Sequence, residues 1–78
     1  MSKKSQLKRE IGDLEREITA LEQKRERSQS ALLRAMLSGA KPNPEDEQYF
    51  KVFSSLIDEA RDNLRKLNRE LDEMTKKK

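Results

Sequence analysis

The segment Ser38–Phe50, SGAKPNPEDEQYF, decides the fold, because it separates two stretches of helical pattern. It holds both prolines of the chain and one of its two glycines. Gly39 suits the left-handed conformation that ends a helix, and Pro42 prevents that helix from continuing. Asn43 is a favourable N-cap residue, and Pro44 fits the first position of a new helix. The segment therefore predicts a sharp turn between two helices.

On both sides of this turn, apolar residues recur at alternating spacings of three and four. The positions before the turn are Leu7, Ile11, Leu14, Ile18, Leu21, Arg25, Ser28, Leu32 and Ala35, and those after it are Phe50, Phe53, Ile57, Ala60, Leu64, Leu67, Leu71 and Met74. This spacing is the heptad pattern of coiled coils. We therefore predict an all-α fold, a single unit over residues 1–78. Two long helices, at about 5–38 and about 44–76, form an antiparallel coiled-coil hairpin around a turn at 39–43.

The heptad residues of the two helices face each other along one line of contact, which we call the seam. The register of the hairpin follows from pairing these two rows of seam residues. Pairs whose residue numbers add up to 85 place Ser28 opposite Ile57 and Arg25 opposite Ala60. In this register the bulk of Arg25 faces a small residue, so its aliphatic stem can lie across the seam while the guanidinium reaches water. The midpoint of the pairing also lies close to the predicted turn.

The composition excludes a large globular core and several kinds of chemistry. Of the 78 residues, 32% are hydrophobic and 42% are charged, which suits long helices with a narrow apolar stripe. The chain has neither cysteine nor histidine, so thiolate chemistry and the usual zinc ligands are missing. We expect no metal site, no cofactor and no catalytic residues, because carboxylates and lysines on solvated helices lack a pocket that would shift their pKa values.

The charge pattern bears on partners and on localisation. The 18 basic and 15 acidic residues are unevenly placed, since bases gather at the two chain ends and acids at Glu45, Asp46 and Glu47. No aromatic residue stands among the terminal bases for base stacking, so we do not expect a nucleic-acid partner. No apolar run approaches the roughly 20 residues that span a bilayer, and the N-terminus lacks the apolar segment of a signal peptide. We therefore expect a cytoplasmic protein without a transmembrane segment.

Beside the turn, the apolar residues exceed what two helices need for one seam. The surplus side chains, which form our candidate partner-binding site, are Leu33, Met36, Leu37, Tyr49, Val52 and Leu56. Leu33 and Leu37 occupy heptad positions that point away from the partner helix. A second protein, a second copy of the chain or the corner itself could cover these side chains, and we favour a second protein.

The run from Ala31 to Leu67 resembles the small helical-hairpin co-chaperones of type III secretion needle subunits. Matching positions are Gly39, Glu47, Gln48, Tyr49, Val52 or Phe53, Leu56 and Ala60. The resemblance implies a protein that pairs with a larger helical-repeat chaperone and helps to keep the needle subunit unpolymerised. The first helix here is longer and more charged than in that family, and the corner carries extra residues around Pro42, Asn43 and Pro44.

A second resemblance, to the antiparallel coiled-coil hairpins of Rho effectors, implies a different function. IDEARDNLRKLNREL, at residues 57–71, is similar to the end of those domains, and KRERSQSALLRA, at residues 24–35, lies where they carry a basic and then an apolar stretch. The Gly-Ala step usual in those domains is replaced here by Ser28 and Gln29. This alternative implies a GTPase-binding hairpin. A coiled-coil adaptor or regulator of another kind, including one that acts as a hairpin homodimer, remains the third possibility.

Overall fold

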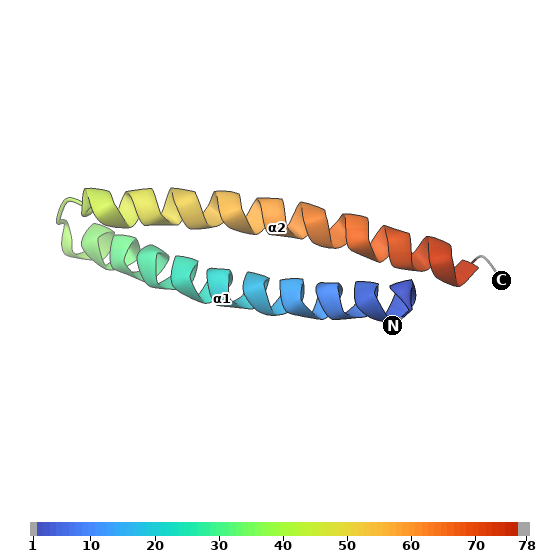
Figure 1. Cartoon of the computed structure of the whole chain (residues 1–78). Helices are drawn as coiled ribbons and strands as arrows, with labels where there is room; N and C mark the ends of the chain where they lie inside the picture. The colour runs from blue at the N-terminus through green and yellow to red at the C-terminus, as the bar shows by residue number, and fades with distance from the viewer. Residues whose placement is uncertain (1, 77–78) are drawn as a thin grey trace.

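The computed structural model describes residues 2–76, which form two helices. Helix α1 spans Lys3–Ser38 and helix α2 spans Pro44–Lys76, and the two lie antiparallel and side by side (Figure 1). The molecule is a rod of 60 × 17 × 16 Å. The predicted all-α helical hairpin is confirmed. The first helix begins two residues before the predicted start at Ser5, whereas α2 has the predicted bounds.

Local hydrogen bonds set both ends of α1. The Ser2 hydroxyl accepts a hydrogen bond of 3.1 Å from the backbone N–H of Ser5, which makes Ser2 the N-cap. At the other end Gly39 adopts φ 74°, and its N–H donates to the carbonyl of Met36 at 3.2 Å. The N–H of Ala40 donates to the carbonyl of Ala35 at 2.9 Å, which completes a Schellman motif. Gly39 therefore ends the helix as its sequence position predicts.

The start of α2 follows the predicted capping chemistry. The Asn43 side-chain oxygen accepts a hydrogen bond of 2.9 Å from the N–H of Glu45, and its backbone carbonyl accepts from Asp46 and Glu47. Pro44 occupies the first helical position, where its missing N–H costs no hydrogen bond. Three acidic residues in this first turn stabilise the helix by interacting with the positive end of its dipole. Both helix ends at the corner are thus determined locally, over residues 35–47.

The core is a single row of side chains between the two helices. The buried residues are Leu7, Ile11, Ile18, Ser28, Ile57 and Ala60. Ile57 is fully buried, whereas other seam residues such as Leu14, Leu21 and Leu67 are half-buried. Each helix therefore covers the other only along the seam, and part of the apolar seam stays accessible from the side.

The observed register differs from the predicted one. The predicted register gives Leu7 no partner, because its counterpart would be residue 78, beyond the end of α2. In the structure Leu7 is only 4% exposed. Ser28, predicted opposite Ile57, instead shares a groove with Phe53 and Tyr49. Phe53 lies four residues before Ile57, so α2 is displaced from the predicted register by roughly one helical turn.

The position of Ala60 along α1 shows the same displacement. Ala60 lines a groove with Leu14 and Leu21, about one turn nearer the N-terminus of α1 than the predicted partner Arg25. Seam positions recur every three or four residues, so a shift of about one turn still places seam residues opposite seam residues, and the spacing of apolar residues alone does not distinguish the two registers. The observed register also covers Leu7, which removes additional apolar surface from water.

Candidate partner-binding site

All six residues of the predicted site are exposed in the hairpin. On α1 the exposed fractions are 54% for Leu33, 69% for Met36 and 81% for Leu37. On α2 they are 51% for Tyr49, 40% for Val52 and 42% for Leu56. Large apolar side chains with this much exposure, gathered near one end of a small protein, are typical of an interaction surface.

The three α2 residues form one continuous line, which we call the α2 stripe (Tyr49, Val52 and Leu56). Their spacing of three and four residues places them on one face of the helix. The ring of Tyr49 stacks on that of Phe53, with centroids 6.1 Å apart. Tyr49 also lines a groove together with Lys24 of α1. The α2 stripe therefore borders a groove between the two helices, and we call this side of the hairpin the groove side.

The three α1 residues form a second line, the α1 stripe (Leu33, Met36 and Leu37). Glu22 of α1 marks one side of the hairpin, because its carboxylate lies 2.5 Å from the guanidinium of Arg61 on α2. The direction of the α1 stripe can be given relative to this residue. At about 100° per residue, Leu33, Met36 and Leu37 all lie within about 60° of Glu22 around the helix axis. The α1 stripe thus lies on the side of the Glu22–Arg61 ion pair, which we call the bridge side.

The two stripes lie on opposite sides of the hairpin. Lys24, which lines the groove, is turned about 160° from Glu22 around the axis of α1. The groove side and the bridge side are therefore nearly opposite, and the predicted site is two separate surfaces. Sequence reasoning identified the exposed residues but placed them on one surface, because it did not assign each helix flank to a side of the hairpin.

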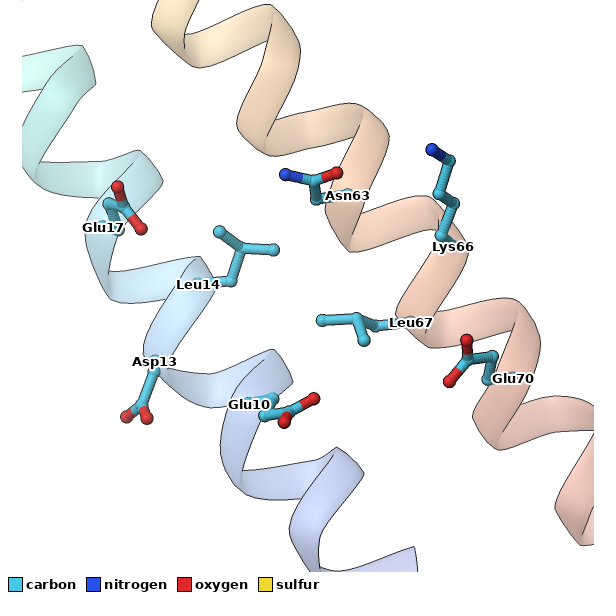
Figure 2. A pocket seen from close by; sticks show the side chains of 8 residues that line it. All are labelled: Glu10, Asp13, Leu14, Glu17, Asn63, Lys66, Leu67 and Glu70. Atoms are coloured by element: carbon cyan, nitrogen blue, oxygen red, sulfur yellow. The ribbon is translucent and has the colours of Figure 1, made fainter.

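A further groove lies on the groove side towards the open end of the hairpin, and sequence reasoning missed it. Leu14 of α1 and Leu67 of α2 point towards one another across the space between the helices (Figure 2). Around them stand acidic residues from both helices, together with Asn63 and Lys66. The acidic residues are Glu10, Asp13, Glu17 and Glu70. The sequence signal was the seven-residue spacing of Glu10 and Glu17 beside the seam, which places both on one flank of α1.

The described part of the chain offers neither a cluster of metal ligands nor a membrane-spanning helix. Over residues 2–76, no group of three or more carboxylates is placed to hold a metal ion. Neither helix, within the same residues, has a window that is long and apolar enough to cross a membrane. The candidate surfaces are apolar stripes bordered by charged residues.

Comparison of the chain with protein-family models, with curated proteins and with solved structures found no match.

Proposed function

We propose that this protein is a non-enzymatic, protein-binding helical hairpin whose α1 stripe docks onto a partner. The observation that carries the proposal is the exposure of Leu33, Met36 and Leu37 side by side within two turns of α1. The neighbouring corner is held by the Schellman motif at Gly39 and the cap at Asn43. The stripe is therefore presented on a preorganised backbone, which lowers the entropic cost of binding.

An amphipathic groove formed by helices is the partner surface that fits the α1 stripe best. Apolar residues at positions i, i+3 and i+4 are the anchors of a helix that lies in a hydrophobic groove. Full burial of one leucine or methionine side chain contributes about 1.5–3 kcal/mol. Three such side chains together contribute about 4.5–9 kcal/mol before the cost of association is subtracted, so tight binding also requires contacts beside the stripe.

Within this proposal we favour a secretion co-chaperone, which would pair with a helical-repeat chaperone and keep a needle subunit unpolymerised. What supports this choice is the match at Gly39, Gln48 and Tyr49 together with the exposed residues around the corner. A helical-repeat chaperone also offers the kind of helical groove that the α1 stripe fits. The Rho-effector resemblance makes a GTP-loaded small GTPase the alternative partner.

The test compares a stripe variant with a matched control. In Leu33→Glu/Leu37→Glu, two charges replace two exposed apolar side chains. In Gln6→Glu/Gln23→Glu, the same two charges replace exposed polar side chains of the same helix at a distance from the stripe. Binding is measured by calorimetry to a purified repeat chaperone with its needle subunit, and separately to a small GTPase with GTP bound. We expect the stripe variant to lose at least about tenfold in affinity for the true partner, because the buried charges would be unpaired.

The outcome separates the candidate functions. Affinity for the chaperone pair that is lost in the stripe variant and kept in the control supports the co-chaperone. The same pattern with the GTPase alone replaces it by the Rho-effector alternative. Equal affinities of both variants for every partner that binds the native chain would contradict a role for the α1 stripe. Circular dichroism of each variant checks that the helices are intact.

A further inference from the structure

The groove side of α1 carries charges whose sign changes at the middle of the helix. In the N-terminal half, the charged residues that line the grooves are Glu10, Asp13 and Glu17, preceded by Lys3 at the start of the helix. In the half nearer the corner they are Lys24 and Arg27. Reversing the direction of the helix therefore brings Lys24 and Arg27 to the level of Glu17 and Asp13. A second α1 that lies antiparallel to the first would meet it with complementary charge.

We propose that a second copy of this chain docks antiparallel on the groove side, so that two hairpins form a four-helix bundle. End-to-end overlap of the two α1 helices places Lys3 of one copy at the level of Ser38 of the other. The same overlap puts Glu17 opposite Lys24, and Asp13 opposite Ser28, one residue from Arg27. A two-fold axis repeats each of these contacts. The register with complete overlap of the two α1 helices is therefore also one in which opposite charges pair.

The centre of the proposed interface is mainly apolar. The two-fold axis passes close to Ala20 and Leu21 of α1. Leu21 shares a groove with Leu56, Glu59 and Ala60 of α2, so these side chains also lie near the axis. Leu56 is 42% exposed in the single hairpin. An apolar centre flanked by ion pairs has the usual anatomy of a protein interface, and it covers part of the α2 stripe.

A parallel arrangement on the same face is unfavourable. A two-fold axis along the helices would place α1 of one copy against α2 of the other at the same level. Glu10 and Glu70 line one groove, and Glu17 and Glu59 line the next. The parallel arrangement therefore brings acid against acid twice over. The antiparallel arrangement brings only Glu59 near an acid, its own symmetry mate close to the axis, and it pairs Glu17 with Lys24, so the charges favour it over the parallel one.

The exposed area of the chain fits a dimer. The accessible surface is 6305 Å² for a chain of 9.2 kDa. A compact monomer of this mass exposes about 4,900 Å². One long face of the rod, 60 by 17 Å, covers about 1,000 Å², close to the roughly 800 Å² that each partner buries in a stable complex. The groove side is therefore large enough for a specific dimer.

The decisive experiment exchanges one pair of charges. The native chain, Glu17→Lys, Lys24→Glu and the double variant Glu17→Lys/Lys24→Glu are compared by sedimentation equilibrium at low salt. We expect a dimer for the native chain. Each single variant should weaken it by at least about tenfold, because like charges then face each other at two symmetric places. The double variant restores opposite charges in the same register, so its dissociation constant should return to within about threefold of the native value.

Two controls make the experiment specific for this face. The variant Glu15→Lys changes an exposed acid seven residues from Glu22, on the bridge side, and should leave the dimer unchanged. Because the chain has no cysteine, Glu17→Cys and Lys24→Cys can be mixed and oxidised. The antiparallel register predicts a cross-link between the two variants in the mixture and none in either variant alone.

Three results would overturn the proposal. The first is a single-chain mass at all concentrations up to about 100 μM, well above typical dissociation constants. The second is a double variant that associates no better than the two single variants. The third is a dimer that survives the charge changes but is lost in Leu33→Glu/Leu37→Glu, because it would lie on the bridge side. The proposal uses the groove side and not the α1 stripe, so it can fail independently of the proposed function.

Discussion

The two ends of α1 carry similar apolar residues but bury them to very different extents. Leu7, near the open end, is 4% exposed, whereas Leu37, at the corner, is 81% exposed. Leu7 stands on the seam, whereas Leu37 stands two residues after the seam position Ala35 and is turned about 200° from it. Heptad position, not residue type, therefore decides whether an apolar side chain contributes to the hairpin or remains available for binding.

The largest expected effect comes from truncating these two leucines. Leu7→Ala should lower the free energy of unfolding by about 2 kcal/mol, because it leaves a cavity against α2. Leu37→Ala should change it by less than about 0.5 kcal/mol, because the side chain has little contact to lose. Urea unfolding followed by circular dichroism measures both at the same dilute concentration. An equal loss in the free energy of unfolding for both variants would contradict the difference between the two ends, since Leu37 would then be buried in contacts.

Alanine substitutions at the two glycines should change the free energy of unfolding by smaller amounts and in opposite directions. Gly39→Ala should destabilise the hairpin by about 1–2 kcal/mol, because φ is 74° and an L-residue is strained there. A Cβ at Gly12 would lie 3.6 Å from Nη1 of Arg16, an ordinary contact. Gly12→Ala should therefore stabilise α1 by about 1 kcal/mol.

Thermal unfolding of the two glycine variants checks these signs. No atom lies within 4 Å of a Cβ built on Gly39, so its cost comes from the backbone and not from a clash. Gly39→Asn serves as the control, because asparagine tolerates the left-handed conformation and should cost less than alanine. A Gly39→Ala variant as stable as the native chain would mean that the helix end does not need this conformation.

The smallest effect is expected between the two ends, at the ion pair of Glu22 and Arg61. Both side chains are about 40% exposed, so water screens their attraction. A double-mutant cycle with Glu22→Ala and Arg61→Ala should give a coupling free energy of about 0.5 kcal/mol, decreasing with salt. A coupling above about 2 kcal/mol would show that this pair, and not the apolar seam, holds the middle of the hairpin.

Most of the fold could be predicted from residues close together in the chain. Gly39, Asn43 and Pro44 act through hydrogen bonds and dihedral angles within a few residues, and the structure shows these caps where the sequence placed them. The N-cap at Ser2 was missed, although serine is a favourable residue at that position. The six surplus apolar residues were also identified correctly as exposed, because their heptad positions place them off the seam.

The candidate site was harder to predict, because it depends on how the two helices face each other. The sequence suggested one surface beside the corner, whereas the structure separates the α1 stripe from the α2 stripe by the width of the hairpin. The acidic groove around Leu14 and Leu67 was missed for the same reason, since Glu10 and Glu70 are distant in sequence. Helix periodicity assigns each residue to a flank, but the partner helix decides which flanks share a side.

By itself, the sequence determined that this chain makes two helices, where each begins and ends at the corner, and which apolar residues lie outside the seam. These properties depend on local backbone chemistry and on a periodicity that holds along each helix separately. Only the tertiary structure decided the register and the division into a groove side and a bridge side. The physical reason is that a heptad row still matches its partner row after a shift of about one turn, so the choice depends on burying Leu7 and on the whole length of the contact.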